Sequence, residues 1–125
     1  MAKILIIDDE VKLRENICEL LLFVGYDVLE ARDGIEGLEK LVQFRPDLII
    51  CDIMMPLLDG YGFMEKQQLS DYSNIPVIFL SAKLDQKDIE KGLALGVKEF
   101  FTKPFVFKEL KQSIENYLLS YKKSQ

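Results

Sequence analysis

The 125-residue sequence contains no histidine. This absence excludes every mechanism in which the chain supplies its own imidazole as a base, a zinc ligand or a phosphoryl carrier. Cysteine is scarce, with only Cys18 and Cys51 present. Because Cys18 lies in a helical pattern and Cys51 in a strand-like run, we expect two small buried thiols and no disulfide framework.

Long apolar runs are also lacking. None approaches the roughly 20 residues that a membrane-spanning helix needs, and Met1 to Lys3 lead directly into a strand-like run instead of a signal peptide. We therefore expect a cytoplasmic protein with no membrane partner. Since repeats and low-complexity linkers are absent too, we expect one domain over residues 1–121 and a tail over 122–125, either as a whole protein or as the front end of a longer one.

The charge is acidic overall and unevenly distributed. The net charge is −5, with 7 basic and 15 acidic side chains in residues 1–82 but 9 and 6 in residues 83–125. No basic stripe or arm is present, so we expect no direct binding of DNA or RNA. A content of 49% apolar and 30% charged residues is typical of a globular domain that folds without a disulfide or a structural metal.

Short apolar runs alternate with helical patterns along the chain. This alternation is typical of an α/β protein in which helices cover both faces of a parallel sheet. Helices are expected between the runs and after the last one. The predicted strands lie at residues 4–7, 28–29, 48–51, 77–80 and 100–101.

Several predicted helices have recognisable ends. Gly25 stops the first helix as a left-handed cap would, and Asp33 with Glu36 predicts an N-cap and a capping box for the second. Asp59 and Gly60 open the third helix, and residues 85–93 form a short charged fourth one. The apolar faces of the second and fifth helices are predicted to be Ile35, Leu38 and Val42, and Leu110, Ile114, Tyr117, Leu118 and Tyr121.

Polar residues follow four of the predicted strands. Asp8 and Asp9 follow the first, Asp52 the third, Ser81 the fourth and Lys103 the fifth. Ligands of open parallel sheets bind outside the carboxyl ends of the strands, so these side chains are expected to converge. A hard divalent cation, most naturally Mg²⁺, would relieve the repulsion between the carboxylates. Acids, a hydroxyl and an ammonium around a metal predict a phosphoryl site.

Each residue type has a role in such a site. Asp52 can attack phosphorus and carry the group as an acyl phosphate. The metal would be held by Asp9 and Asp52, with help from Asp8 through water. Lys103 would supply a positive charge and Ser81 a hydrogen bond, because phosphoryl transfer depends mainly on positioning and charge stabilisation.

Taken in order, the motifs IIDDE, CDIMMPLLDG, FLSAK and FFTKPF resemble the receiver domain of two-component response regulators over nearly the whole chain. The resemblance implies a doubly wound, flavodoxin-like (βα)5 fold with strand order 2-1-3-4-5. It also implies that Asp52 is the phosphoacceptor, that Asp8 and Asp9 are the acidic pair, and that the Met54 carbonyl is the third protein ligand of Mg²⁺.

The resemblance extends to the residues that sense the phosphoryl group. It implies that Ser81 and Lys103 bind this group, that Phe100 changes rotamer when Ser81 moves, and that the Lys103–Pro104 bond is cis. Phe100 lacks the hydroxyl of the tyrosine found in many family members, so no output hydrogen bond runs through this ring. Residues 97–99 also lack the acidic pair of the receivers that dimerise through their last helices.

The resemblance therefore implies a signalling switch and not an enzyme, although the domain would assist its own phosphorylation and dephosphorylation. Since the chain has no histidine, a sensor histidine kinase or a phosphotransfer protein must donate the phosphoryl group. The altered surface would then bind an output protein or domain that the sequence does not name.

Two other functions use similar residues. An aspartate-nucleophile phosphohydrolase would need a second Asp two residues after the nucleophile, where Met54 stands, and a cap domain. A flavin or nucleotide binder would need a glycine-rich phosphate loop after a strand, and none is present.

Ordinary structural roles also exist for the same side chains. Asp8 and Asp9 could cap a helix, Ser81 could belong to a plain loop, and Lys103 could be a solvated surface lysine. Phe100 can be a core residue as well as a switch. The lysines at 83, 87 and 91 follow i, i+4 spacing, which is typical of a solvated helix face.

Overall fold

A five-stranded parallel sheet with the order β2-β1-β3-β4-β5 forms the centre of the computed structural model, which describes residues 1–123 and the side chains of residues 1–120. The predicted fold and strand order are confirmed. The elements are β1 (Lys3–Ile7), α1 (Val11–Phe23), β2 (Asp27–Ala31), α2 (Gly34–Phe44), β3 (Leu48–Asp52), α3 (Gly60–Gln68), β4 (Val77–Ser81), α4 (Gln86–Ala94), β5 (Glu99–Thr102) and α5 (Phe107–Lys123).

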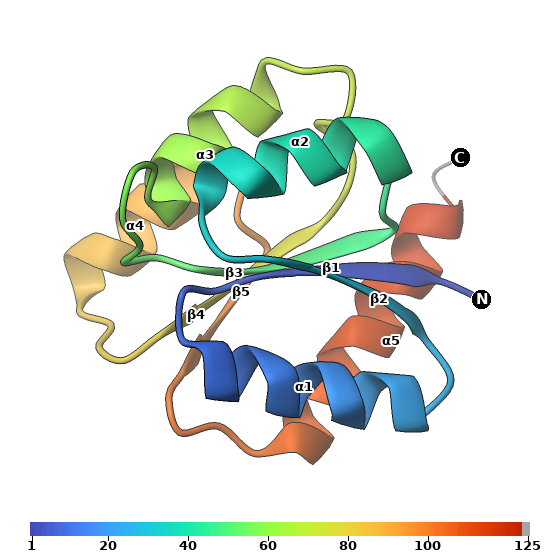
Figure 1. Ribbon diagram of the computed structural model, residues 1–125. Helices are drawn as coiled ribbons and strands as arrows, with labels where there is room; N and C mark the ends of the chain where they lie inside the picture. The colour runs from blue at the N-terminus through green and yellow to red at the C-terminus, as the bar shows by residue number, and fades with distance from the viewer. Residues whose placement is uncertain (124–125) are drawn as a thin grey trace.

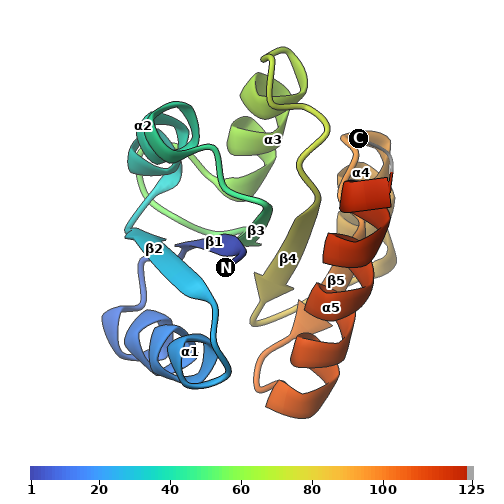
Figure 2. The same ribbon diagram turned by 90° about the vertical axis from the view of Figure 1, so that its right-hand side faces the viewer.

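Helices cover both faces of the sheet, with α1 and α5 on one face and α2, α3 and α4 on the other (Figures 1 and 2). Alternate side chains of each strand face opposite layers. In β1, Leu5 and Ile7 pack toward α2 and α3, whereas Ile4 and Ile6 pack toward α1 and α5. Because both faces are covered, the central strands are continuously apolar except at their ends instead of alternating with polar residues.

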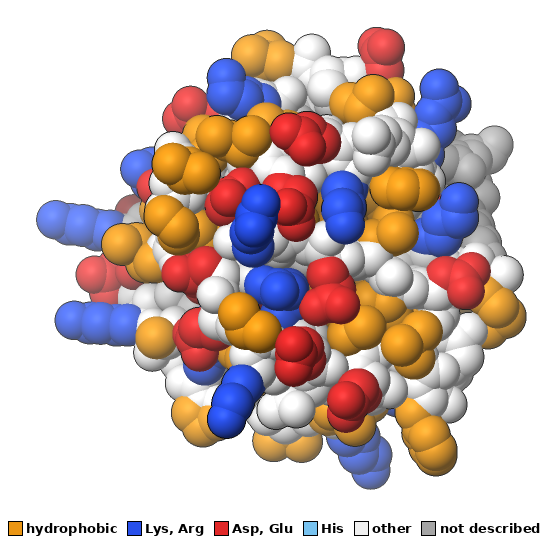
Figure 3. All heavy atoms as spheres, viewed as in Figure 1, with side chains coloured by type: hydrophobic (Ala, Val, Ile, Leu, Met, Phe, Trp, Pro, Cys, Tyr) orange, Lys and Arg blue, Asp and Glu red, His pale blue; other side chains and the backbone are white. Residues whose placement is uncertain are grey.

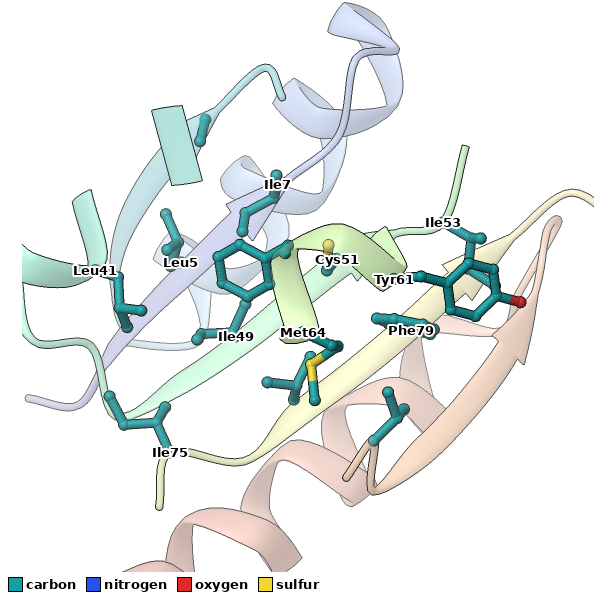
Figure 4. Close-up of a cluster of buried hydrophobic side chains, with 14 residues drawn as sticks. Leu5, Ile7, Leu41, Ile49, Cys51, Ile53, Tyr61, Met64, Ile75 and Phe79 are labelled. Carbon is teal, nitrogen blue, oxygen red and sulfur yellow. The ribbon is translucent and has the colours of Figure 1, made fainter. Parts of the chain in front are cut away.

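The layer of α3 is anchored by large side chains that pack over β3 and β4 (Figure 4). Phe63 and Phe79 are both fully buried, and the ring of Tyr61 lies edge-on to that of Phe79 with 5.9 Å between centroids. This packing fixes the start of α3, and with it the loop that follows β3.

The predicted apolar face of α2 was wrong. Ile35 and Val42 are 45% and 59% exposed, and the buried residues of the helix are Gly34, Gly37 and Leu41. The helix approaches the sheet through its glycines, because a Cβ at Gly37 would lie only 2.5 Å from Cδ1 of Ile7. Glycine gives no apolar signal in a sequence, so the periodicity indicated the wrong face.

The helix ends agree largely with the predictions. Gly25 has a φ of +103° after α1, and Asp59 accepts a hydrogen bond from the Gly62 amide at the start of α3. Asp33 caps α2, but the predicted capping box is absent there because the Glu36 carboxylate accepts from the Arg32 amide instead of the Asp33 amide. The described helix α5 runs two residues past the predicted domain end, and residues 124–125 of the predicted tail and the Tyr121 side chain lie outside the description.

Two further predictions concern the surface and the thiols. Within residues 1–123, no helix is both long and apolar enough to cross a membrane. Figure 3 shows acidic and basic side chains interspersed on one face of the molecule. Cys51 is buried and Cys18 half-buried, and both are free thiols.

Candidate functional site

The polar residues that follow the strands, except the buried Asp8, line one cavity of about 260 Å³. It lies at the carboxyl edge of the sheet, where the predicted site was expected. Asp9, Asp52, Met54, Ser81 and Lys103 all contribute to its wall, together with Glu10, Ala82 and Lys83.

Asp52 is the last residue of the central strand β3 and is 5% exposed. The chain behind it is packed closely, because a Cβ at Gly60 would lie 2.6 Å from the Asp52 carbonyl oxygen. Gly60 also donates its amide to the Ile53 carbonyl at 2.7 Å. The start of α3 therefore backs the Asp52 main chain directly and fixes its position.

Asp8 lies deeper than any other acidic group of the site, with 1% exposure. Its Oδ1 accepts a hydrogen bond from the Glu10 amide at 2.9 Å, while Arg14 donates to the Asp8 carbonyl at 2.7 Å and holds the loop. Oδ2 of Asp8 has no hydrogen-bond partner among the described residues. The oxygen instead forms an ion pair with the Lys103 ammonium at 3.1 Å, because a buried carboxylate needs a positive charge beside it.

The Lys103 ammonium lies among the carboxylates. Its Nζ is 2.9 Å from Glu10 Oε1, 3.1 Å from Asp8 Oδ2 and 3.4 Å from Asp52 Oδ2. The backbone amide of Lys103 donates to the Ser81 carbonyl at 2.7 Å, and the Lys103–Pro104 bond is cis, as the resemblance implied. The end of β5 is thereby fixed beside that of β4.

Burial dominates the electrostatics of the site. It raises the pKa of Asp52 from 3.8 to about 6, with a further rise from the charge of Asp8 and an opposing effect from Lys103. Burial likewise raises the pKa of Asp8. For Lys103, burial acts to lower the pKa, but the contacts with Glu10, Asp8 and Asp52 outweigh it and the net shift is upward.

The side chains of Ser81 and Phe100 each make defined contacts. The Ser81 hydroxyl donates to the Lys83 carbonyl at 2.9 Å. Phe100 is half-buried and stands edge-on to Phe79 with 5.9 Å between centroids. A Cβ at Gly92 of α4 would lie 2.5 Å from its ring, so the ring fills the space beside this glycine.

The carboxylates can hold a metal ion. Oxygens of Asp8, Glu10 and Asp52 lie within 4.8 Å of one another, and Asp8 and Asp52 are both buried. Hard oxygen donors of this kind suit Mg²⁺. The exposed Asp9 lines the same cavity but is not part of this close group, whereas Glu10 is.

Glu10 was missed by reasoning from the sequence. The signal was present, since the IIDDE motif places a third acid after the first strand. As an exposed residue at the N-cap of α1, Glu10 has the appearance of an ordinary solvated side chain until its contact with Lys103 is seen.

The family model for the response regulator receiver domain matches residues 4–115. The chain belongs to this family. The receiver family serves two-component signalling and is a signalling family rather than a class of conventional enzymes, so the predicted family and class of function are confirmed.

Relatives of this receiver include proteins named as transcriptional regulators. The probable transcriptional regulator ycf27 of Porphyridium aerugineum is 43% identical over 116 residues, which cover 93% of this chain and 48% of that protein. The chain thus spans about half the length of the curated relatives it matches.

Solved structures of receivers have the same fold. A CheY-like response regulator receiver domain protein from Methanospirillum hungatei has a TM-score of 0.94 at 25% identity, covering 100% of this chain and 99% of that one. The response regulator TrrA of Thermotoga maritima, solved in complex with Mg²⁺-BeF, has a TM-score of 0.84 at 31% identity, covering 94% and 99%.

Proposed function

We propose that this receiver accepts a phosphoryl group on Asp52 from a sensor histidine kinase or a phosphotransfer protein, in the presence of Mg²⁺, and that its binding surface for an output protein or domain then changes. One observation carries the proposal. The buried Asp52 carboxylate stands at the end of the central strand, 3.4 Å from the Lys103 ammonium, in a cavity lined by acidic groups and a serine hydroxyl. The complex of TrrA with Mg²⁺-BeF supports the same use of the site.

The chemistry needs one bond formed and one broken. An Asp52 carboxylate oxygen attacks phosphorus, and the bond from phosphorus to the donor's histidine nitrogen breaks with its electron pair leaving on that nitrogen. Lys103 lies where it can pair with the oxygens of the transferred group, and the Ser81 hydroxyl can donate to them once it leaves the Lys83 carbonyl. Hydrolysis by water restores the carboxylate.

Mg²⁺ would be held by Asp8, Asp9 and Asp52 with the Met54 carbonyl, and Glu10 is close enough to contribute directly or through water. When bound, the metal supplies positive charge that offsets the charge on the transferred oxygens. The deep burial of Asp8 keeps one acidic group fixed, while the exposed Asp9 can adjust.

The proposal is tested by incubating the protein with acetyl phosphate and Mg²⁺ and measuring the intact mass. We expect one phosphoryl adduct that needs Mg²⁺ and is removed by hydroxylamine, as an acyl phosphate is. An unmodified mass under saturating conditions, or an adduct that resists hydroxylamine, would count against phosphorylation of a carboxylate.

The lifetime of this acyl phosphate is expected to depend on Met54 and Lys83, which line the same cavity as Asp52. Neither side chain can act as a base, and the apolar Met54 cannot orient a water molecule. We therefore predict a long-lived phosphoprotein. The double variant Met54→Asn with Lys83→Glu should shorten its half-life severalfold, since both new groups can hold and polarise water.

Phosphate release is to be followed in saturating Mg²⁺ after removal of the donor. Lys87→Glu is the matched control, because it makes the same charge change at an exposed position of α4 outside the cavity. Equal half-lives for the wild type and the double variant would show that water access is controlled elsewhere.

Phosphorylation is expected to alter the face formed by α4, β5 and the start of α5. A phosphoryl group that draws the Ser81 hydroxyl away from Lys83 opens space beside Phe100, whose ring contacts α4 at Gly92. Helix α4 is held to α3 by a hydrogen bond from the Tyr61 hydroxyl to Asp88 at 3.1 Å and by the Lys91 ammonium, which lies 4.2 Å from the centre of the Tyr61 ring. An element fixed by so few contacts responds to a bias of a few kcal/mol.

Amide hydrogen exchange with Mg²⁺ and beryllofluoride should therefore differ from that with Mg²⁺ alone across residues 81–110. Asp52→Asn provides the control, since it should show no response to beryllofluoride. Identical exchange in the wild type under both conditions would rule out a change of this face.

A further inference from the structure

Glu10 makes the shortest contact of the Lys103 ammonium. The distance from Nζ to Glu10 Oε1 is 2.9 Å, and this is a hydrogen bond, whereas Asp8 and Asp52 lie at 3.1 and 3.4 Å. The Glu10 side chain is 58% exposed, while that of Lys103 is 10% exposed. The ammonium is thus buried but held toward the open side of the site by a solvent-facing carboxylate.

The position of Glu10 in α1 makes this contact more informative. Glu10 is the N-cap residue of α1, yet its side chain makes no capping hydrogen bond to the helix. The side chain reaches across the site to β5 instead, over a separation of 93 residues. The Glu10 carboxylate is therefore committed to Lys103 and not to the start of its own helix.

We propose that Glu10 is a positioning residue that restrains Lys103 before phosphorylation, and that its release lets the ammonium pair with the phosphoryl group. The inference rests on the proposed function of Asp52. In the unphosphorylated protein, the contact with Glu10 keeps the ammonium from pairing more closely with Asp8 and Asp52, so both carboxylates remain available to a divalent cation. The same contact must break or lengthen when Lys103 turns to the oxygens on Asp52.

Two consequences follow for a variant without this restraint. Lys103 would reach the transferred oxygens without first leaving Glu10, so phosphorylation by acetyl phosphate at saturating Mg²⁺ should be faster. The freed ammonium would also compete with Mg²⁺ for Asp8 and Asp52, so the Kd for Mg²⁺ should rise. The energy of an exposed ion pair corresponds to a change of about two- to fivefold in the phosphorylation rate or in the Kd for Mg²⁺.

Glu10→Gln and Glu10→Asp separate the restraint from simple charge. Glu10→Gln removes both the charge and the ion pair. Glu10→Asp keeps the charge, but its shorter side chain favours capping the amides of α1 and does not reach Lys103 in the same way. Glu65→Gln is the matched control, because it removes one exposed negative charge from α3 away from the cavity.

The experiment measures the phosphorylation rate by intact mass and the Mg²⁺ affinity by calorimetry in the four proteins. The proposal predicts that both Glu10 variants are phosphorylated about two- to fivefold faster and bind Mg²⁺ about two- to fivefold more weakly, with Glu65→Gln like the wild type. Unchanged values in both Glu10 variants would overturn it. Changed values in Glu10→Gln, with Glu10→Asp like the wild type, would also overturn the proposal, because the loss of negative charge alone would then explain the effect.

The two proposals can fail independently. If the wild type takes up no phosphoryl group, the proposed function of Asp52 fails, while the Mg²⁺ affinities still test the restraint. Weaker Mg²⁺ binding in both Glu10 variants that disappears when Lys103→Met is added would then support a restraint on Lys103. Equal binding, or weaker binding that persists without Lys103, would overturn it.

Discussion

Replacing Asp52 by Asn is expected to abolish the phosphoryl adduct completely. The amide has nearly the shape of the carboxylate but is not a nucleophile, so no acyl phosphate can form at this position. The cavity keeps the carboxylates of Asp9 and Glu10 in this variant, so loss of the adduct would show that neither of them replaces Asp52 as the acceptor. Intact mass after incubation with acetyl phosphate and Mg²⁺ measures the loss.

Asp59→Asn is the matched control for this result. Asp59 lies at the end of the loop that follows Asp52 and caps α3 by accepting a hydrogen bond from the Gly62 amide at 2.8 Å, and Asn caps helices as well as Asp does. This variant should keep the adduct. Stoichiometric phosphorylation of Asp52→Asn would contradict the assignment of Asp52.

The Asp52→Asn substitution should also stabilise the fold at neutral pH. Burial raises the pKa of Asp52 to about 6 in the folded protein, against an ordinary value of 3.8. A group whose pKa is higher in the folded state favours folding fully at pH below about 4, and this contribution is lost as the pH rises through about 6. The difference corresponds to at most about 3 kcal/mol, and the opposing effect of Lys103 is already included in this pKa.

Asp52→Asn is therefore expected to unfold with a free energy about 1–3 kcal/mol higher than the wild type above pH 7, and with nearly the same free energy at pH 4. Urea denaturation in EDTA at several pH values measures this difference without bound metal. A gain that is equal at pH 4 and pH 8, or a variant that is less stable at pH 8, would contradict the destabilising burial of the charged Asp52 carboxylate.

The sequence predicted the features that depend on order along the chain. Apolar runs without alternation indicated buried parallel strands. Parallel strands bring their carboxyl ends to one edge of the sheet, so Asp52, Ser81 and Lys103 were expected at one site. The structure places all three on the same cavity. Gly25 and Asp59 predicted helix ends because their conformational roles are local.

Features that depend on distances between elements were not predicted. The face of α2 was misassigned because close packing against Ile7 uses Gly37, which has no apolar side chain to signal it. The contact between Glu10 and Lys103 joins residues 93 positions apart, and no local pattern records it. The direction of the Ser81 hydroxyl toward the Lys83 carbonyl likewise depends on a rotamer that the sequence does not specify.

The central claim is that the phosphoryl group is carried by Asp52. Treatment of the acetyl phosphate-reacted protein with borohydride reduces an acyl phosphate of aspartate to homoserine, and mass spectrometry of peptides then locates the reduced residue. The account predicts that the change falls on Asp52 and appears only when Mg²⁺ is present during phosphorylation. Reduction at Asp8, Asp9 or another carboxylate, with Asp52 unchanged, would contradict it.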